Sequence, residues 1–217
     1  MCDLSLIINH LTEKQVFQMN SNENGKFIVL GGLDQTGKST QAQKLVNYLN
    51  EHGKNAILTH EPTGTELGSQ LKKIMSEQIV SAETMRLLFT AARQHHLETV
   101  IRPAIARGDW VVCDRYFEST YAYQGAMGIS DDSLLTMHQL LKHDQLIDHQ
   151  FIFVGKIGAR SELDKDHLDN FCDQKRSDIQ NRLITYSKLH PENTTVIKMS
   201  NQSQSWVLHQ ILAKIFN

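Results

Sequence analysis

A glycine-rich segment near the start of the chain carries residue types that bind phosphate. Residues 32–40 read Gly-Leu-Asp-Gln-Thr-Gly-Lys-Ser-Thr and fit the phosphate-loop (P-loop) pattern Gly-x4-Gly-Lys-Ser/Thr. The glycines let the backbone approach phosphate oxygens closely and aim its N–H groups at them. The ammonium of Lys38 can reach the outer phosphates, and the hydroxyl of Ser39 can bind Mg²⁺. The pattern predicts a nucleoside triphosphate site made by Gly32, Leu33, Asp34, Gln35, Thr36, Gly37, Lys38, Ser39 and Thr40.

The elements on either side of this loop must hold it in place. Residues 26–30 are typical of a short buried strand, and apolar residues recur at helical spacing from Ala42 to Leu49, until Gly53 ends the helix. In this order, an anion bound by the loop lies at the positive end of the helix that follows. This context disfavours the alternative, a glycine-rich turn without a ligand.

Strand and helix patterns alternate along the rest of the chain. Short apolar strands separated by helices indicate a parallel sheet covered on both faces, whose carboxyl edge binds ligands. We therefore predict an α/β fold, a P-loop three-layer sandwich. The expected strands are 27–30, 56–59, 110–113, 150–154 and 194–199, and the expected helices are 39–52, 66–76, 82–107 with a kink at Pro103, 130–142, one ending near Leu189, and 204–216.

Composition narrows the class of protein further. The chain has 217 residues, enough for one domain with a sizeable core, and a net charge of −2 gives no electrostatic reason to bind nucleic acid or an anionic membrane. No apolar run approaches the ~20 residues of a membrane span. Cys2, Cys113 and Cys172 show neither metal-ligand spacing nor a disulfide framework, which suits a reducing cytoplasm. Cys113 is expected in the core.

The first 25 residues form an extension before the domain at 26–217. The apolar run at 4–8 is too short for a signal peptide and lacks a basic flank. A short helix, a disordered tail and a start site that truly lies at Met19 all remain open for this extension.

Two later segments place charges at defined positions. Asp114 closes the predicted strand at 110–113, where a carboxylate can orient the water shell of Mg²⁺, and Arg115 can bind a phosphate with two N–H groups. Phe89 and Arg93 are four residues apart on a predicted helix, so ring and guanidinium share a face that could hold a base. The alternatives are a loop ion pair between Asp114 and Arg115, a core position for Phe89 and a surface position for Arg93.

Four motifs in a fixed order resemble those of bacterial thymidylate kinases. They are the loop at 32–40, His-Glu-Pro-Thr-Gly-Thr-Glu-Leu-Gly at 60–68, Leu-Leu-Phe-Thr-Ala-Ala-Arg at 87–93, and Asp-Arg-Tyr-Phe-Glu-Ser-Thr-Tyr-Ala-Tyr-Gln-Gly at 114–125. The resemblance implies a five-stranded parallel core, a homodimer and reversible transfer of the ATP γ-phosphate to dTMP, giving dTDP for dTTP synthesis. It also implies Mg²⁺ at Ser39 and Asp114.

The resemblance assigns roles on the acceptor side as well. It puts Asp34 near the acceptor sugar, the ring of Phe89 on thymine, and Arg115 on the acceptor phosphate. It puts Arg93 on the base and Tyr123 beside the deoxyribose, where a ring would exclude a ribose hydroxyl. The full acceptor set is Asp34, Glu61, Pro62, Phe89, Arg93, Arg115, Thr120, Tyr123 and Gln124.

Several positions depart from the family pattern. Gln35 and Thr36 stand where the loop usually has glycine and a small residue, so Gln35 must tolerate the local backbone geometry. Gly31 stands in place of the usual Glu, His60 of the usual Arg, and Ala92 of the usual Asp.

The largest departure is the lid, expected near 155–176, which lacks the family's Asp-Arg-x-Glu. Phosphoryl transfer needs cations around the transferring group, and a missing arginine can cost ~10³–10⁵ in rate. The remaining candidates are Arg160, Lys156, Lys165 and Arg176, and we select Arg160 because of its planar fork. The predicted catalytic set is thus Lys38, Asp34, Arg115 and Arg160, whereas a lid that is only a solvated charged loop remains the alternative.

Three hypotheses remain for the whole chain: an active dTMP kinase with an altered lid, a relative acting on another deoxynucleotide or a nucleoside, and a nucleotide-binding paralogue with weakened catalysis. Phe89, Arg93, Arg115 and Tyr123 argue against a large change of acceptor. The altered lid favours the paralogue, and the intact Lys38 disfavours it.

Overall fold

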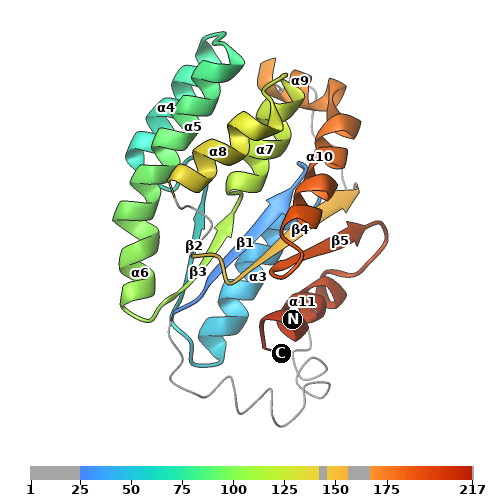
Figure 1. Ribbon diagram of the computed structural model, residues 1–217. Coiled ribbons are helices and arrows are strands. Elements are labelled where there is room, and N and C mark those ends of the chain that lie inside the picture. Colours follow the sequence, from blue (N-terminus) through green and yellow to red (C-terminus); the bar gives the residue numbers. More distant parts are fainter. Residues whose placement is uncertain (1–24, 142–145, 156–166, 217) are drawn as a thin grey trace.

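A five-stranded, all-parallel sheet forms the centre of the molecule, as predicted (Figure 1). The computed structural model describes residues 25–141, 146–155 and 167–216, and the predicted N-terminal extension lies almost wholly outside them. The strand order is β2-β3-β1-β4-β5. The strands are β1 (Phe27–Gly32), β2 (Ala56–His60), β3 (Trp110–Asp114), β4 (His149–Gly155) and β5 (Thr194–Met199).

The register brings the carboxyl ends of the three strands that matter most to one edge. Leu30 of β1 lies beside Asp114 of β3, which in turn lies beside His60 of β2. Backbone hydrogen bonds continue past the strands, because the Arg115 N–H donates to the Leu30 carbonyl at 3.0 Å and the Glu61 N–H donates to the Asp114 carbonyl at 3.0 Å. This edge therefore holds the P-loop, Glu61 and Arg115 as one rigid frame.

Helices cover both faces of the sheet, which explains the near-continuous apolar strands. Ile28 and Leu30 face helices α3 (Lys38–Glu51) and α11 (Gln204–Ile215), whereas Phe27 and Val29 face the opposite layer. That layer contains α5 (Ala82–His96), α6 (Arg102–Ala106), α7 (Phe117–Ala126), α8 (Asp131–Leu140) and α10 (Arg176–Leu189), with α4 (Glu66–Glu77) beside α5 and α9 (His167–Gln174) beside α10. The three-layer prediction is confirmed.

Two helical predictions needed correction. The single helix expected at 82–107 is divided, because a π-helical segment, η1 (Leu97–Ile101), separates α5 from α6 just before Pro103. Proline has no N–H to donate, so a change of helical register there is a common accommodation. Helix α7 was not predicted at all. Eight of its ten residues are buried, so it shows no apolar stripe of helical period.

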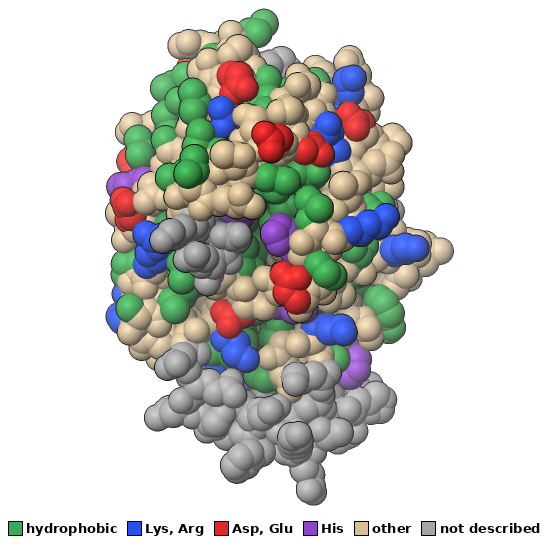
Figure 2. All heavy atoms as spheres, in the orientation of Figure 1, with side chains coloured by type: hydrophobic (Ala, Val, Ile, Leu, Met, Phe, Trp, Pro, Cys, Tyr) green, Lys and Arg blue, Asp and Glu red, His purple; other side chains and the backbone are tan. Residues whose placement is uncertain are grey.

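The surface fits the modest net charge. On the face drawn in Figure 2, acidic and basic side chains are interspersed, and neither sign gathers into a large patch. Among the described residues, no helix has the length and apolarity to span a bilayer. Cys113 lies in the core, as expected.

Candidate active site

The P-loop turns sharply at the end of β1, and its glycines make the turn possible. Gly32 has φ +135°, and a Cβ there would lie 2.2 Å from the Phe153 carbonyl oxygen of β4. Gly37 has φ +86° and is the residue from which helix α3 begins. Side chains are strained at such φ values, so both positions favour glycine.

Gln35 occupies a glycine-like conformation, as the sequence required. Its φ is +63°, in the left-handed region that costs an ordinary residue about 1–2 kcal/mol. The neighbouring Thr36 is fully buried, and its hydroxyl donates to the Leu33 carbonyl at 2.8 Å. The loop thus accommodates Gln35 at a positive φ and buries Thr36 within the turn.

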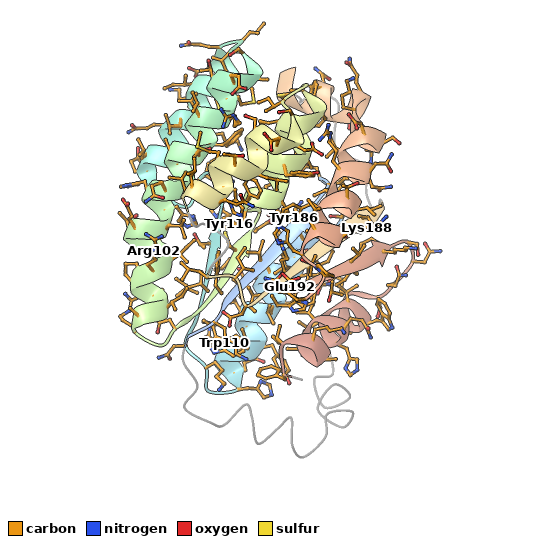
Figure 3. All side chains as sticks on the ribbon, viewed as in Figure 1. Arg102, Trp110, Tyr116, Tyr186, Lys188 and Glu192 are labelled. Atoms are coloured by element: carbon orange, nitrogen blue, oxygen red, sulfur yellow. The ribbon has the colours of Figure 1, made fainter. Side chains whose placement is uncertain are left out.

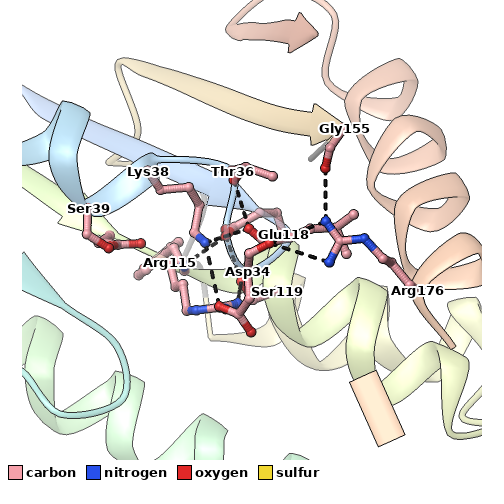
Figure 4. A network of polar contacts seen from close by, with 12 residues as sticks. Asp34, Thr36, Lys38, Ser39, Arg115, Glu118, Ser119, Gly155 and Arg176 are labelled. Atoms are coloured by element: carbon pink, nitrogen blue, oxygen red, sulfur yellow. Dashed lines mark hydrogen bonds and ion pairs between the residues drawn. The ribbon is translucent and has the colours of Figure 1, made fainter. Parts of the chain in front are cut away.

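Lys38 lies folded into the loop. Its Nζ donates to the Leu33 carbonyl at 2.9 Å and lies 3.9 Å from Asp34 Oδ1 (Figure 4). Burial, followed by repulsion from Arg115, lowers the pKa of Lys38 to about 8. A phosphate at the loop would replace the carbonyl as the partner of this ammonium.

Ser39 and Asp114 meet across the carboxyl edge, as the metal prediction requires. The Ser39 hydroxyl donates to Asp114 Oδ2 at 2.5 Å, and the buried Asp114 Oδ1 has no hydrogen-bond partner among the described residues. Oxygen atoms are the ligands that Mg²⁺ prefers, so the pair fits this ion. No cluster of three or more His, Cys, Asp or Glu suited to a metal exists in the described part of the chain. A cation here would therefore take its other ligands from water and phosphate.

A cavity of about 280 Å³ opens beside the loop. All nine residues predicted to bind the acceptor line it: Asp34, Glu61, Pro62, Phe89, Arg93, Arg115, Thr120, Tyr123 and Gln124. They come from the P-loop, the segment after β2, α5, the turn after β3, and α7. Residues scattered over the sequence thus form one wall, although the roles assigned to them by resemblance stay predictions.

Arg93 is a buried member of this wall and not a surface charge. Its Nε donates to Glu61 Oε2 at 2.7 Å, and its Nη2 donates to the Tyr116 carbonyl at 3.1 Å and to the Thr120 hydroxyl at 3.0 Å. His96, fully buried behind it, lies 3.4 Å from the other oxygen of Glu61. The network holds the guanidinium in one orientation at the cavity.

Arg115 follows Asp114 in the sequence but pairs with Asp34, so the idea of a local Asp114–Arg115 ion pair is wrong. Its φ is +71°, which turns the side chain back over the P-loop to the carboxylate of Asp34. The guanidinium carbon lies 5.2 Å from the centre of the Tyr123 ring, and Nη1 donates to the Ser119 hydroxyl at 3.4 Å. Three side chains thus orient this cation.

A second cavity, of about 340 Å³, contains Ser39 and Asp114 and shares Glu61, Pro62, Lys72 and Arg115 with the first. His60, one of the departures from the family pattern, also lines it. Lys72 was not predicted from the sequence. Helix α4 carries adjacent lysines, and only packing shows that Lys72 faces both cavities.

Of the four lid candidates, only Arg176 lies within the described residues; Arg160, Lys156 and Lys165 lie outside them. At the start of α10, Arg176 Nη2 donates to the Gly155 carbonyl at 3.0 Å and to the Asp34 carbonyl at 3.4 Å. Lys38, Arg115 and Arg176 therefore all contact or approach the same loop residue, Asp34 (Figure 4).

Fold and site together define a P-loop nucleotide kinase, since the cavity lined by Arg93 and Arg115 adjoins the phosphate loop where an acceptor must lie. Residues 30–211 match the sequence profile of thymidylate kinases, and the chain belongs to the thymidylate kinase family.

Individual relatives agree with this assignment. A thymidylate kinase of Bordetella petrii is 42% identical over 59% of this chain, and the match spans 63% of the relative's length, which is less than two thirds. One from Vesicomyosocius okutanii is 33% identical over 82% of this chain and 91% of its own. The crystal structure of an Ehrlichia chaffeensis thymidylate kinase matches 90% of this chain and all of its own, with a TM-score of 0.70 and 25% identity.

Proposed function

We propose that this protein transfers the γ-phosphate of ATP to dTMP, with Mg²⁺, and so produces dTDP. The observation that carries the proposal is the junction of the two cavities. The cavity with Ser39 and Asp114 meets the cavity with the predicted acceptor residues at Glu61, Pro62, Lys72 and Arg115. A donor phosphate on one side and an acceptor phosphate on the other would then face each other across Arg115, as an in-line transfer requires.

The donor side is the loop from Gly32 to Thr40. Its N–H groups and Lys38 would hold the ATP phosphates, and the ammonium would exchange its bond to the Leu33 carbonyl for a phosphate oxygen. Ser39 and Asp114 would hold Mg²⁺, which neutralises charge on the phosphates when bound. These residues position charge around the reacting group, and positioning is most of what phosphoryl transfer needs.

The acceptor side is the cavity that all nine predicted acceptor residues line. Arg115, held between Asp34 and the Tyr123 ring, would bind the acceptor phosphate. Phe89 would stack on the thymine ring beside Arg93, whose Nη1 makes no hydrogen bond within the described part of the chain and is available to the base. Tyr123 would pack against the sugar and reject a ribose hydroxyl.

Arg176 and Arg160 are the two arginine candidates for the lid cation that neutralises charge on the transferring phosphoryl group. The contacts of Arg176 with the P-loop support it, because its guanidinium reaches the Asp34 carbonyl, beside the groups that would hold both phosphates. Arg160 remains the prediction from sequence alone.

We also propose a homodimer in a reducing cytoplasm. The family resemblance supports the dimer, and Cys113 and Cys172, which form no disulfide, support the compartment.

A panel of acceptors tests the function. ADP release is measured by a coupled assay with dTMP, dUMP, dCMP, dGMP, UMP and thymidine, with Mg·ATP as the donor. We expect kcat/KM to be highest for dTMP and low for ribonucleotides. A different preferred acceptor would identify a related deoxynucleotide or nucleoside kinase. ATP binding without transfer to any member of the panel would identify a nucleotide-binding paralogue.

A further inference from the structure

Glu118 is a buried carboxyl group beside the site that lies within the motif at 114–125, where no role was predicted for it. It lies in the first turn of α7, is 1% exposed, and its Oε1 accepts from the Tyr116 N–H at 3.1 Å and from the Ser119 hydroxyl at 2.9 Å. Its buried Oε2 has no hydrogen-bond partner in the part of the chain that the structure describes. Burying a carboxylate in this way costs free energy, so a retained one calls for a reason.

Capping of the helix does not explain the burial. Glu66, Glu83 and Asp131 occupy the first turns of α4, α5 and α8, and all three are exposed. An acid interacts favourably with the start of a helix at the surface, without being desolvated. Glu118 differs from these residues because it lies against Gly31 of β1, where the strand enters the P-loop.

Gly31, the last residue but one of β1, makes room for this carboxyl group. A Cβ at Gly31 would lie 2.4 Å from Glu118 Cγ, 2.5 Å from Oε1 and 2.6 Å from Cδ. Gly31 is not among the residues with positive φ, so the backbone does not require glycine there. The space taken by Glu118 does require it.

The carboxylate connects to the acceptor arginine through one hydroxyl. Ser119 Oγ donates to Glu118 Oε1 at 2.9 Å and accepts from Arg115 Nη1 at 3.4 Å (Figure 4). An accepting carboxylate orients the serine hydroxyl so that its lone pairs face the guanidinium. Asp34 and Tyr123 hold Arg115 from the other sides.

We infer that Glu118 is a positioning residue for the acceptor phosphate: it fixes Arg115 through Ser119, from a space that Gly31 leaves open. The inference rests on the proposed function, since it takes Arg115 as the phosphate ligand. The side chain touches no substrate itself. Its loss leaves the arginine held by Asp34 and Tyr123 but removes the contact that fixes Nη1 on the Ser119 side.

Kinetics of Glu118→Ala test the inference against its matched control, Asp131→Ala. Asp131 also accepts two hydrogen bonds, from Tyr121 and Arg182, and lines neither cavity. Both variants should lose thermal stability. Only Glu118→Ala should raise the KM for the monophosphate, by about fivefold, with the KM for ATP changed less than about twofold. Equal changes in both KM values, or none, would overturn the inference.

Two further variants protect the test from a folding failure. Ser119→Ala breaks the connection but keeps the bond from Glu118 to the Tyr116 N–H, and it should reproduce the rise in acceptor KM. Gly31→Ala should raise that KM in the parent by displacing the carboxyl group, and should add nothing in Glu118→Ala. An undiminished effect of Gly31→Ala in that background would contradict the shared space.

A binding measurement separates this inference from the proposed function. With the P-loop filled by Mg·ADP, calorimetric titration with inorganic phosphate, compared between the parent and Arg115→Ala, isolates binding at the Arg115 site whatever the true acceptor is. Glu118→Ala should weaken phosphate binding by about the factor expected for the monophosphate KM, and it should leave ADP binding unchanged. If the parent transfers no phosphate to dTMP, yet this difference in phosphate affinity persists, the function fails and the role of Glu118 stands. Unchanged phosphate affinity would reject that role.

Discussion

The carboxyl edge of the sheet gathers buried side chains of both charges, whereas the amino edge is built mainly from aromatic rings. At the carboxyl edge, ionisable side chains are buried among one another: Lys38, Glu61, Arg93 and Glu118 are all at most 8% exposed. Asp34 pairs with Lys38 and Arg115, and Glu61 pairs with Arg93. Glu118 accepts a hydrogen bond from the Tyr116 N–H in the turn after β3. Backbone strain collects at the same edge, since Gln35 and Arg115 are non-glycine residues with positive φ.

At the amino edge, aromatic rings fill the interior, and the buried Lys54, 8% exposed, lies beside one of them. Trp110 lies at the start of β3 (Figure 3). Its ring stacks on Phe216 with ring centres 5.5 Å apart. The ammonium groups of Lys26 and Lys54 lie 5.1 and 6.0 Å from the indole ring. Backbone strain and a cluster of desolvated charges are costly, so their coincidence at the carboxyl edge indicates where function has been favoured over stability.

The largest expected effect belongs to the carboxyl edge. Lys38→Ala should abolish phosphoryl transfer and leave the fold intact, because the ammonium acts on the outer phosphates and its burial is itself unfavourable. Activity and the melting temperature are measured together. Lys44→Ala, on the same helix but outside both cavities, is the control. A Lys38→Ala protein with near-normal turnover would show that the loop is not the donor site.

The amino edge should respond in stability alone. Trp110→Ala is expected to lower the free energy of unfolding by about 3–5 kcal/mol, since a large buried ring is lost. The KM values of the remaining folded enzyme should not change. Trp206, which is 46% exposed, provides the matched control, and Trp206→Ala should have little effect on denaturant unfolding. A changed acceptor KM in Trp110→Ala would mean that the two edges are coupled.

Arg176→Ala tests which cation stabilises the transition state. If Arg176 has this role, its loss should lower kcat by about 10²–10³ and barely alter nucleotide affinity, because the interaction exists only in the transition state. Arg182, on the same helix, pairs with Asp131 and serves as the control. The kcat of Arg182→Ala should be close to that of the parent. A normal Arg176→Ala enzyme beside a slow Arg160→Ala enzyme would assign the role to Arg160.

Arg115→Ala should raise the KM for dTMP roughly tenfold or more and change that for ATP far less. A lost charge-assisted hydrogen bond costs ~1.5–3 kcal/mol, and only the acceptor phosphate is assigned to this arginine. Arg107→Ala, which removes an exposed arginine paired with Asp109, is the control in steady-state kinetics. Equal effects on both substrates would refute the assignment.

The smallest effect concerns pH at the amino edge. Burial, followed by repulsion from Lys214, lowers the pKa of His149 to about 4. A group whose pKa is depressed by folding destabilises the native state as pH falls from about 6.5 towards 4, since only the unfolded chain then takes up the proton. The melting temperature should therefore fall less steeply over this range in His149→Gln than in the parent. Identical pH profiles of the melting temperature in the two proteins would show that His149 does not cause the loss of stability at low pH.

Local sequence by itself determined much of the carboxyl edge. The glycines at 32 and 37, Lys38 and Ser39 follow from what a phosphate needs, and the four-residue spacing of Phe89 and Arg93 follows from helical geometry. The parallel α/β class follows from apolar strands that alternate with helices. Such features depend on neighbours in the chain, so periodicity and spacing reveal them.

Tertiary structure alone decided the partners of the charges. Helix α7 is buried all round and gave no periodic signal, yet it carries Glu118, Thr120 and Tyr123 into the site. Arg115 pairs with Asp34 instead of its neighbour Asp114, because its left-handed backbone turns it over the loop. Gly31 stood out only as a missing acid, and its contact with Glu118 shows that a carboxyl group from α7 lies against that position. These pairings join residues far apart in the chain, and packing against the sheet sets them.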